Sequence, residues 1–274
     1  MPILRCRDIN VYYEIAGAGD PLLFIHGLGS SHRDWEPQVA FFSRHYQVIT
    51  YDVRGHGKSD KPKGPYSVSQ FAADAAELMR SLAIAPAHIV GLSMGGMIAF
   101  QLTLDEPARV KSLVIVNSAP ELIIRTFEQR LEFWRRRIIV RLFGARKLAE
   151  IMGVRLLPSP EHEALRQALV ERWAENDTRA YLQALNAIVG WSVAEHIRAI
   201  RCPTLVITAD QDYTPVSTKQ AYMAHILHAE LVVIPDSRHL LPLERPEAFN
   251  AALMAFLRRS SYQTPPNGLG LAMP

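Results

Sequence analysis

HIVGLSMGGM, residues 88–97, joins an apolar run to a glycine-rich turn and then to an apolar helical pattern. Within it Gly91, Ser93 and Gly95 form a G-x-S-x-G motif between a predicted strand and a predicted helix. The glycines leave room for a sharp turn that projects the serine side chain above the sheet. Free N–H groups at the helix start favour negative charge there. A serine in such a turn is usually only a turn residue, but the strand–turn–helix context predicts that Ser93 is a nucleophile.

Short apolar runs alternate with helical patterns on both sides of this stretch. Most of the runs are continuous, as in a parallel sheet that is covered on both faces. Helices are predicted at residues 67–82, where Ser67 and Gln70 form a capping-box start, and at 94–104 and 246–258. This alternation indicates βαβ units, and therefore an α/β fold. The predicted strands are residues 22–25, 47–51, 88–91, 112–116, 204–208 and 230–234.

The alternation stops between about residues 120 and 196. That region is helical by pattern, rich in arginine and interrupted at Pro158 and Pro160. Its place between two strands predicts a helical cap over the carboxyl edge of the sheet. The final residues are rich in proline and glycine, which predicts a flexible tail. We therefore predict a core of residues 1–120 and 196–260, a cap of residues 121–195 and a tail of residues 261–274.

A glycine-containing loop, His26-Gly-Leu-Gly29, follows an earlier predicted strand. In a serine site of the strand–turn–helix kind, such a loop supplies one backbone N–H to the oxyanion, and the residue after the nucleophile supplies another. These donors are assigned to Leu28 and Met94. His26 is interpreted as a residue that orders the loop rather than one that exchanges protons.

The general base is sought among ten histidines. His239 follows a predicted strand and precedes the last helix, and it fits the chain order serine, acid, histidine. The acid should follow a strand between Ser93 and His239, where TLVITADQDYTP offers Asp210 and Asp212. Asp212, further out on the loop, is chosen to hold the imidazole, whereas Asp210 is expected to bond local backbone N–H groups. The earlier segment VNSAP, residues 116–120, contains no carboxylate.

The motifs HGLGSSHRDW, YDVRGHGKSDKP, GLSMGGM, ADQDYTP and RHLLPLERPEAF together resemble the α/β-hydrolase superfamily. Residues 64–82 and 87–97 are similar to the 3-oxoadipate enol-lactonases and to the esterase and cofactor-free haloperoxidase branch. The resemblance implies a mostly parallel eight-stranded sheet with helices on both faces and a helical cap insertion. It implies Ser93, Asp212 and His239 as the catalytic triad, with Leu28 and Met94 as oxyanion donors. Two positions depart from the usual glycines, namely Ala209 and Arg238.

The cap contains a basic stretch, LEFWRRRIIVRLFGARK, at residues 131–147. One interpretation is a cap helix that prefers acidic substrates or contacts an anionic lipid surface. The favoured interpretation is a solvated cationic face above an apolar face that packs on the core. The apolar residues in question are Leu131, Trp134, Ile138 and Leu142.

Composition limits the partners. A formal net charge of +3 is too small to indicate nucleic-acid binding. Cys6 and Cys202 lack the spacing of a metal site and are predicted to be buried thiols. The N-terminal residues lack the apolar run of a signal peptide, and no stretch is long enough to span a membrane, so a cytoplasmic location is predicted. A homodimer remains an open alternative.

Together these features predict a serine hydrolase that cleaves carboxylic esters of small or medium substrates through an acyl-enzyme on Ser93, without metal or cofactor. Two alternatives use the same triad: hydrolysis of an enol-lactone, and hydrolysis of a carbon–carbon bond in a dienoic diketone. A third alternative, from another class, is a ligand-binding protein that keeps the fold without turnover.

Overall fold

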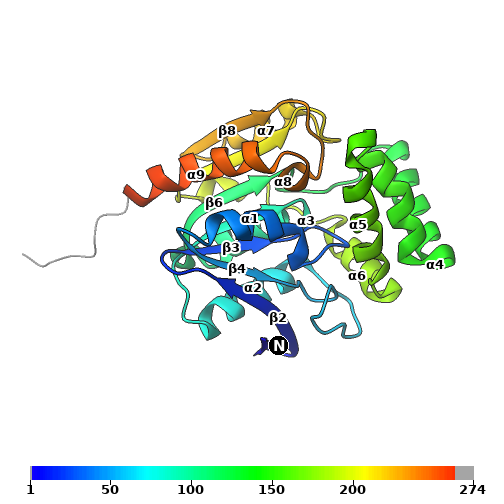
Figure 1. Cartoon of the computed structure of the whole chain (residues 1–274), viewed down its shortest axis with the longest axis horizontal. Helices are drawn as coiled ribbons and strands as arrows, with labels where there is room; N and C mark the ends of the chain where they lie inside the picture. Colours follow the sequence, from blue (N-terminus) through cyan, green and yellow to red (C-terminus); the bar gives the residue numbers. More distant parts are fainter. Residues whose placement is uncertain (1, 263–274) are drawn as a thin grey trace, which may run out of the picture.

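A computed structural model describes residues 2–262 of the chain and contains one eight-stranded sheet (Figure 1). The spatial order is β1-β2-β4-β3-β5-β6-β7-β8. The six strands β3 to β8 run parallel to one another. This confirms the predicted α/β fold with a mostly parallel sheet. The strands are β1 Ile3–Cys6, β2 Ile9–Ala16, β3 Pro21–Ile25, β4 Gln47–Tyr51, β5 Ala87–Leu92, β6 Val110–Val116, β7 Thr204–Ala209 and β8 Ala229–Ile234.

Strands β1 and β2 were absent from the set predicted by pattern. They lie at one edge of the sheet, where β2 pairs antiparallel with both β1 and β4. Their residues include exposed and charged side chains, and burial along β2 is irregular. Arg5 in β1, and Asn10 and Glu14 in β2, interrupt the apolar residues, so these strands lack the continuous apolar runs by which the other six were recognised.

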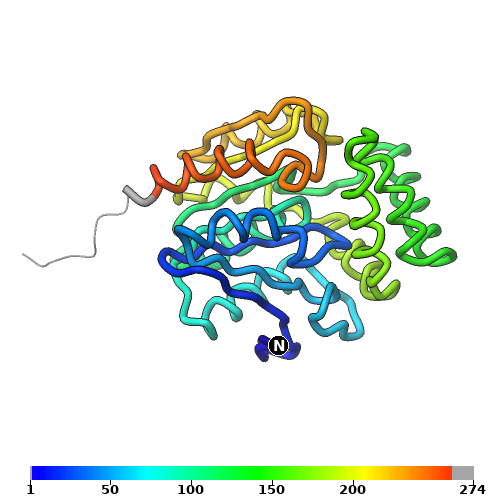
Figure 2. The backbone as a smooth tube through the Cα atoms, in the orientation of Figure 1, coloured from blue at the N-terminus to red at the C-terminus, as the bar shows by residue number. Residues whose placement is uncertain are grey.

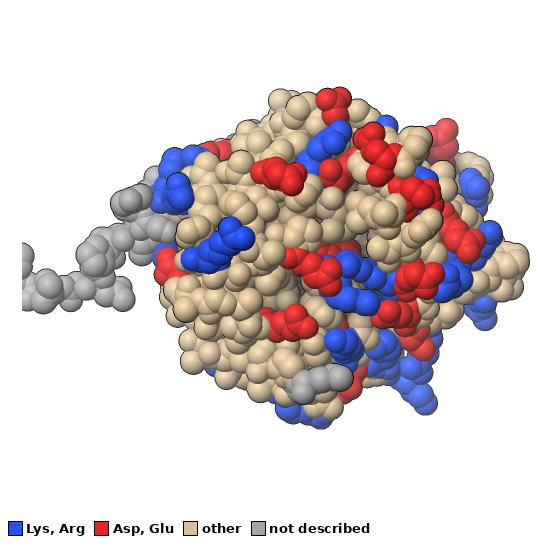
Figure 3. Space-filling view, viewed as in Figure 1, with Lys and Arg blue, Asp and Glu red and all other residues tan. Residues whose placement is uncertain are grey.

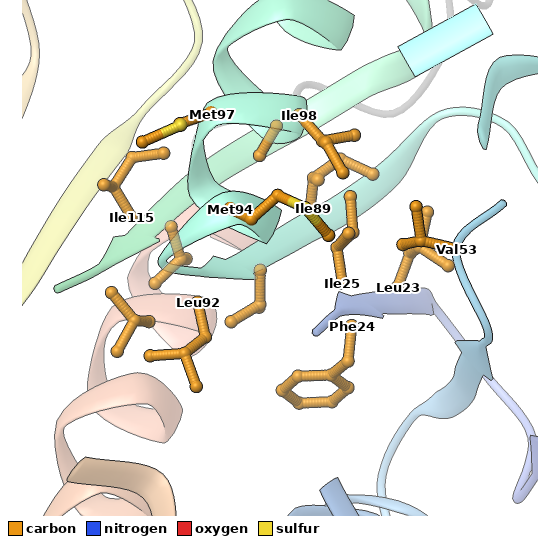
Figure 4. Packing of buried hydrophobic residues seen from close by; sticks show 14 of the residues in the cluster. Leu23, Phe24, Ile25, Val53, Ile89, Leu92, Met94, Met97, Ile98 and Ile115 are labelled. Atoms are coloured by element: carbon orange, nitrogen blue, oxygen red, sulfur yellow. The ribbon is translucent and has the colours of Figure 1, made fainter. Parts of the chain in front are cut away.

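The central parallel strands are buried on both faces. Side chains from β3, β5 and the following helix meet in one cluster, in which Phe24, Ile25, Ile89 and Ile98 are fully buried (Figure 4). Burial of such a side chain contributes about 1.5–3 kcal/mol to stability. The cluster includes Leu92 and Met94, which flank Ser93, so the turn that carries Ser93 is anchored in the core (Figure 4).

Helices cover both faces of the sheet, with α1, α8 and α9 on one side and α2 and α3 packed together on the other (Figure 1). The predicted helix start at Ser67 is confirmed, because its side chain accepts a hydrogen bond from the Gln70 N–H. The last helix continues to Tyr262, and the rest of the predicted tail lies outside the described residues. The core helices are α1 Glu36–Phe42, α2 Val68–Ser81, α3 Met94–Asp105, α7 Val216–Met223, α8 Leu241–Glu244 and α9 Pro246–Tyr262.

The insertion between β6 and β7 forms a helical layer at one end of the sheet (Figure 2). Its two ends pair through backbone hydrogen bonds, from Leu122 N–H to the Trp191 carbonyl (2.9 Å) and from Val193 N–H to the Pro120 carbonyl (2.8 Å). The first helix has non-helical backbone angles at Gly144, so it consists of two segments. The cap helices are α4 Phe127–Leu156, α5 Glu163–Ala174 and α6 Thr178–Ile188.

Charged side chains of both signs gather over the cap and its border with the core (Figure 3). Ion pairs cross this border, including Arg33 with Glu175 (2.5 Å) and Arg172 with Glu36 (2.7 Å). Exposed pairs of this kind contribute about 0–1 kcal/mol each. Among residues 2–262, no helix is long and apolar enough to cross a membrane, and no group of three or more potential ligands is arranged for a metal ion.

Candidate active site

Ser93 lies at the turn between β5 and α3 with φ 55° and ψ −116°. The residues two positions before and after Ser93 lack side chains, which lets the chain turn this sharply. A Cβ at Gly91 would lie 2.2 Å from the Gly95 carbonyl oxygen, and a Cβ at Gly95 would lie 2.1 Å from the Ile25 carbonyl oxygen. The G-x-S-x-G pattern therefore reflects the close approach of two loops.

Hydrogen bonds on both sides of Ser93 hold this conformation. Its N–H donates to the Val116 carbonyl (3.0 Å), and its carbonyl accepts from the Gly96 N–H (2.9 Å). The Ser118 hydroxyl also donates to the Ser93 carbonyl (2.7 Å). The loop after β6 thus supports the turn after β5, and the serine side chain remains available to react.

Asp212 and His239 lie in the loops that follow β7 and β8, which are neighbouring parallel strands. Nδ1 of His239 donates to Oδ1 of Asp212 at 2.7 Å, and the Asp212 side chain is fully buried. Burial opposes ionisation of Asp212, but the charges and hydrogen bonds of His239 and Lys219 outweigh it and lower the pKa of this carboxyl. With Nδ1 protonated, Nε2 of His239 is left as the proton acceptor.

Ser93 and His239 line the same cavity, which has a volume of about 520 Å³. The sheet edge supplies its floor and the cap supplies the opposite wall, through Phe133, Arg136 and Trp173 among others. The Tyr213 ring stacks on His239 with ring centroids 4.0 Å apart. A volume of this size holds a small or medium organic molecule.

The predicted oxyanion donors are the backbone N–H groups of Leu28 and Met94. Met94 is the first residue of α3, and Leu28 lies in the loop after β3 and lines the cavity. Within residues 2–262, neither backbone N–H has an acceptor. His26 is fully buried: its Nδ1–H donates to the Gly27 carbonyl (2.8 Å) and its Nε2 accepts from the Val53 N–H (3.0 Å). Burial lowers its pKa, so His26 is neutral and orders the loop.

A comparison with known proteins identifies the family of this arrangement. The family model of the alpha/beta hydrolase fold matches residues 20–246. The chain belongs to the α/β-hydrolase family. It is 31% identical to 3-oxoadipate enol-lactonase 2 of Acinetobacter baylyi. The aligned 266 residues cover 93% of this chain and 96% of that protein.

Solved structures agree with this assignment. The enol-lactonase of Burkholderia xenovorans LB400 has a TM-score of 0.87 at 27% identity, over 94% of this chain and 100% of that chain. A thermophilic esterase of Thermogutta terrifontis, solved with malate bound, has a TM-score of 0.85 at 27% identity. The match covers 92% of this chain and 94% of the esterase chain. The predicted resemblance to this branch is confirmed, and this α/β-hydrolase is a hydrolytic enzyme.

Lys219 is a residue of the site that the sequence reasoning missed. Its side chain is fully buried on α7, and its ammonium contacts Oδ2 of Asp212 at 2.6 Å. The ammonium also donates to the Thr214 carbonyl. Burial lowers the pKa of Lys219, and the Asp212 charge opposes that shift. A lysine on a short helix gives no sequence signal of this contact, because only the fold brings it under the acid loop.

Asn117 is a second residue that the α/β-hydrolase motifs did not reveal. Its amide donates to the carbonyls of Arg238 and His239 (3.0 Å each), and its carbonyl oxygen accepts from the Ala209 N–H (2.9 Å). Asn117 therefore ties the histidine loop to the end of β7. The one available signal was its position directly after β6, in the segment where only a carboxylate was sought.

Asp210 differs from its prediction. Its carboxylate accepts from the Ser237 N–H at 3.1 Å, which belongs to the histidine loop rather than to its own turn. The expectation of local bonding was wrong because the loops after β7 and β8 lie side by side. Ala209 and Arg238 stand where glycine is usual in the family, and both are held in place by hydrogen bonds. The Ala209 N–H donates to Asn117 and the Arg238 N–H donates to the Glu244 carboxylate (2.5 Å).

The favoured interpretation of the basic stretch is also wrong in its packing. Leu131, Trp134, Ile138 and Leu142 were expected to pack on the core, but all four are exposed. The face of α4 that turns inward instead carries Gln129, Phe133 and Arg136, which line the cavity, and the fully buried Val140.

Arg136 is the arginine of this stretch that points toward the cavity. Its Nε donates to the Tyr181 hydroxyl at 2.5 Å. Arg155, which also lines the cavity, is paired with Glu132 at 2.6 Å. Within the described residues Arg136 has no carboxylate partner, so a cationic group without a counter-ion faces the space above Ser93.

Proposed function

We propose that this enzyme hydrolyses carboxylic esters of small or medium-sized substrates through an acyl-enzyme on Ser93. The observation that supports this most directly is the cavity of about 520 Å³, which is shared by Ser93 and by a histidine bound to a buried carboxylate. The names of the similar proteins, an enol-lactonase and an esterase, support hydrolysis at an acyl carbon.

The proposed reaction has two acyl-transfer steps. Ser93 Oγ attacks the ester carbonyl while His239 Nε2 takes its proton, and the N–H groups of Leu28 and Met94 stabilise the oxyanion. His239 then protonates the leaving alcohol, and the acyl group remains on Ser93. Water attacks this acyl-enzyme with His239 again as base, which releases the acid and restores the serine. Asp212 stays ionised and holds the imidazole throughout.

The test measures hydrolysis of p-nitrophenyl acetate, butyrate and octanoate by wild type, Ser93→Ala and Thr218→Val. Thr218 also lines the cavity, so its variant is the control for a lost hydroxyl. The proposal expects kcat to fall by about 10⁴-fold or more in Ser93→Ala alone. Intact-mass detection of a fluorophosphonate adduct should likewise depend on Ser93. Equal activity of Ser93→Ala and wild type would overturn the mechanism.

A second candidate is hydrolysis of a lactone that carries a carboxylate. It is favoured by Arg136, whose guanidinium has no carboxylate partner in the described chain and lines the cavity. Such a group would bind the substrate carboxylate by charge-assisted hydrogen bonds. Replacing Arg136 with Gln should then raise KM for an acidic lactone by about 10- to 100-fold and leave KM for a neutral ester unchanged.

Arg135→Gln is the matched control, since Arg135 is exposed and does not line the cavity. Product analysis separates the remaining alternatives. An ester yields an alcohol and an acid, a lactone yields one hydroxy or oxo acid, and a dienoic diketone yields two fragments by carbon–carbon cleavage. Tight binding of a small molecule without any turnover would instead favour a binding protein.

A further inference from the structure

The outer face of the first segment of α4 carries an apolar stripe that is exposed to solvent. We call this set the outer stripe: Phe127, Leu131, Trp134, Ile138 and Leu142, which are 78%, 49%, 61%, 45% and 68% exposed. Their spacing of three or four residues places them on one side of the helix. Isolated apolar side chains on a surface are ordinary, but an aligned set of large ones indicates an interaction site.

The stripe is separate from the catalytic cavity. Gln129, Phe133 and Arg136 line the cavity from the opposite side of the same helix. The segment therefore has one surface that closes the active site and another that faces away from it. A ligand on the outer stripe would not enter the cavity, so the occupant of the stripe is a different molecule from the substrate at Ser93.

Arginines border the stripe on both sides. By helical position, Arg130, Arg137 and Arg141 flank one side and Arg135 flanks the other. Within residues 2–262 none of these four has an ion-pair partner. In contrast, Arg146, Lys147 and Arg155, further along α4, are each paired with a glutamate. The cations beside the stripe are thus available to an external anion.

We propose that the outer stripe docks on an anionic phospholipid surface. An exposed apolar face bordered by arginines suits the boundary between acyl chains and charged headgroups, where Trp134 is also favourably placed. A hollow of about 160 Å³, lined by Arg130, Trp134 and Arg137 together with residues of α6, offers space for a headgroup phosphate. A second copy of the chain fits less well, because a twofold contact through the stripe would bring the two sets of arginines together.

The experiment is flotation of the full chain with phosphatidylcholine vesicles that contain or lack about 30% phosphatidylglycerol. Wild type should bind the anionic vesicles only, and about 1 M salt should release most of it. The Ile138→Ser/Leu142→Ser variant should lose about tenfold or more in partitioning. Arg137→Gln/Arg141→Gln should lose binding to anionic vesicles by a similar factor.

Leu227→Ser is the matched control, because Leu227 is 66% exposed but lies in the core domain between α7 and β8. Its variant should bind as wild type does, and all variants should share the wild-type thermal unfolding. The proposal is overturned if wild type fails to float with anionic vesicles, or if the stripe variant floats as well as wild type. Concentration-dependent dimerisation that the stripe variant abolishes would identify a second copy as the occupant and would also overturn it. None of these readouts depends on catalysis.

Discussion

The carboxyl edge of the sheet and the outer face of α4 differ in which kind of side chain is buried and which is exposed. At the sheet edge, polar groups are buried and paired: Asp212 is fully buried between His239 and Lys219. On the outer face of α4, large apolar groups such as Trp134 and Leu142 are exposed. Buried polar groups and exposed apolar groups both cost free energy, so each departure indicates a function. The first serves chemistry at Ser93, and the second is where we propose a docking surface.

Asp212→Asn should give the largest effect among the changes at the sheet edge that leave Ser93 in place. The Lys219 ammonium can donate only to the amide oxygen, so the amide NH₂ would turn toward His239 Nδ1. That would place the proton on Nε2 and leave no base for Ser93. We expect kcat to fall by about 10³- to 10⁴-fold, measured with a p-nitrophenyl ester.

Asp210→Asn serves as the control for this change, because Asp210 is exposed and contacts only the backbone of the histidine loop. Its kcat should remain within about threefold of wild type. A comparable loss in both variants would mean that loop structure, rather than the imidazole tautomer, is being measured.

Acidification should destabilise the core through its buried neutral histidines. Burial lowers the pKa of His56 to about 3 and that of His88 to about 4. The unfolded chain takes up protons near pH 6.5, where the native state does not, so the free energy of unfolding falls as the pH falls below about 6.5. For these two residues we expect a loss of about 4 kcal/mol between pH 7 and pH 5.

Urea unfolding followed by circular dichroism at both pH values would measure this loss. His88→Gln should remove about 2 kcal/mol of this loss, because the proton uptake of one buried histidine is removed. An unchanged free energy of unfolding between pH 7 and pH 5 would contradict the assignment of neutral, buried histidines.

Lys219→Met tests whether the buried cation supports the acid. Removing one partner of a buried ion pair should lower the free energy of unfolding by about 3 kcal/mol. The pKa of Asp212 should rise, so the acidic limb of the kcat/KM profile should move to higher pH. Lys111→Met is the control: its pair with Asp20 lies at the surface, and its loss should cost about 1 kcal/mol or less. A profile that keeps the wild-type acidic limb would contradict this role.

Leu142→Ala should give the smallest effect, because its side chain is already in water. We expect the free energy of unfolding to change by less than about 0.5 kcal/mol. Leu148→Ala, on the same helix but 2% exposed, should cost about 2–5 kcal/mol. Chemical denaturation of both variants would check the contrast. Equal losses would show that the outer stripe is packed rather than exposed.

Local patterns predicted the sheet well. All six predicted strands are present, because continuous apolar runs can be satisfied only between two covering layers. The turn at Ser93 was also predictable, since Gly91 and Gly95 are required by close backbone contacts. Strands β1 and β2 were missed because charged and polar residues interrupt their apolar residues.

The sequence by itself determined the order of strands and helices and the residue types at each turn, since these depend on neighbours along the chain. Only the tertiary structure decided that Lys219 lies under Asp212, that Asn117 holds the histidine loop, and that the arginine-rich helix turns Arg136 inward. A helical repeat specifies which side chains share a face, but not which face meets the core. That choice depends on the shape and chemistry of the surface that the helix covers, and here the covered surface is the cavity above Ser93.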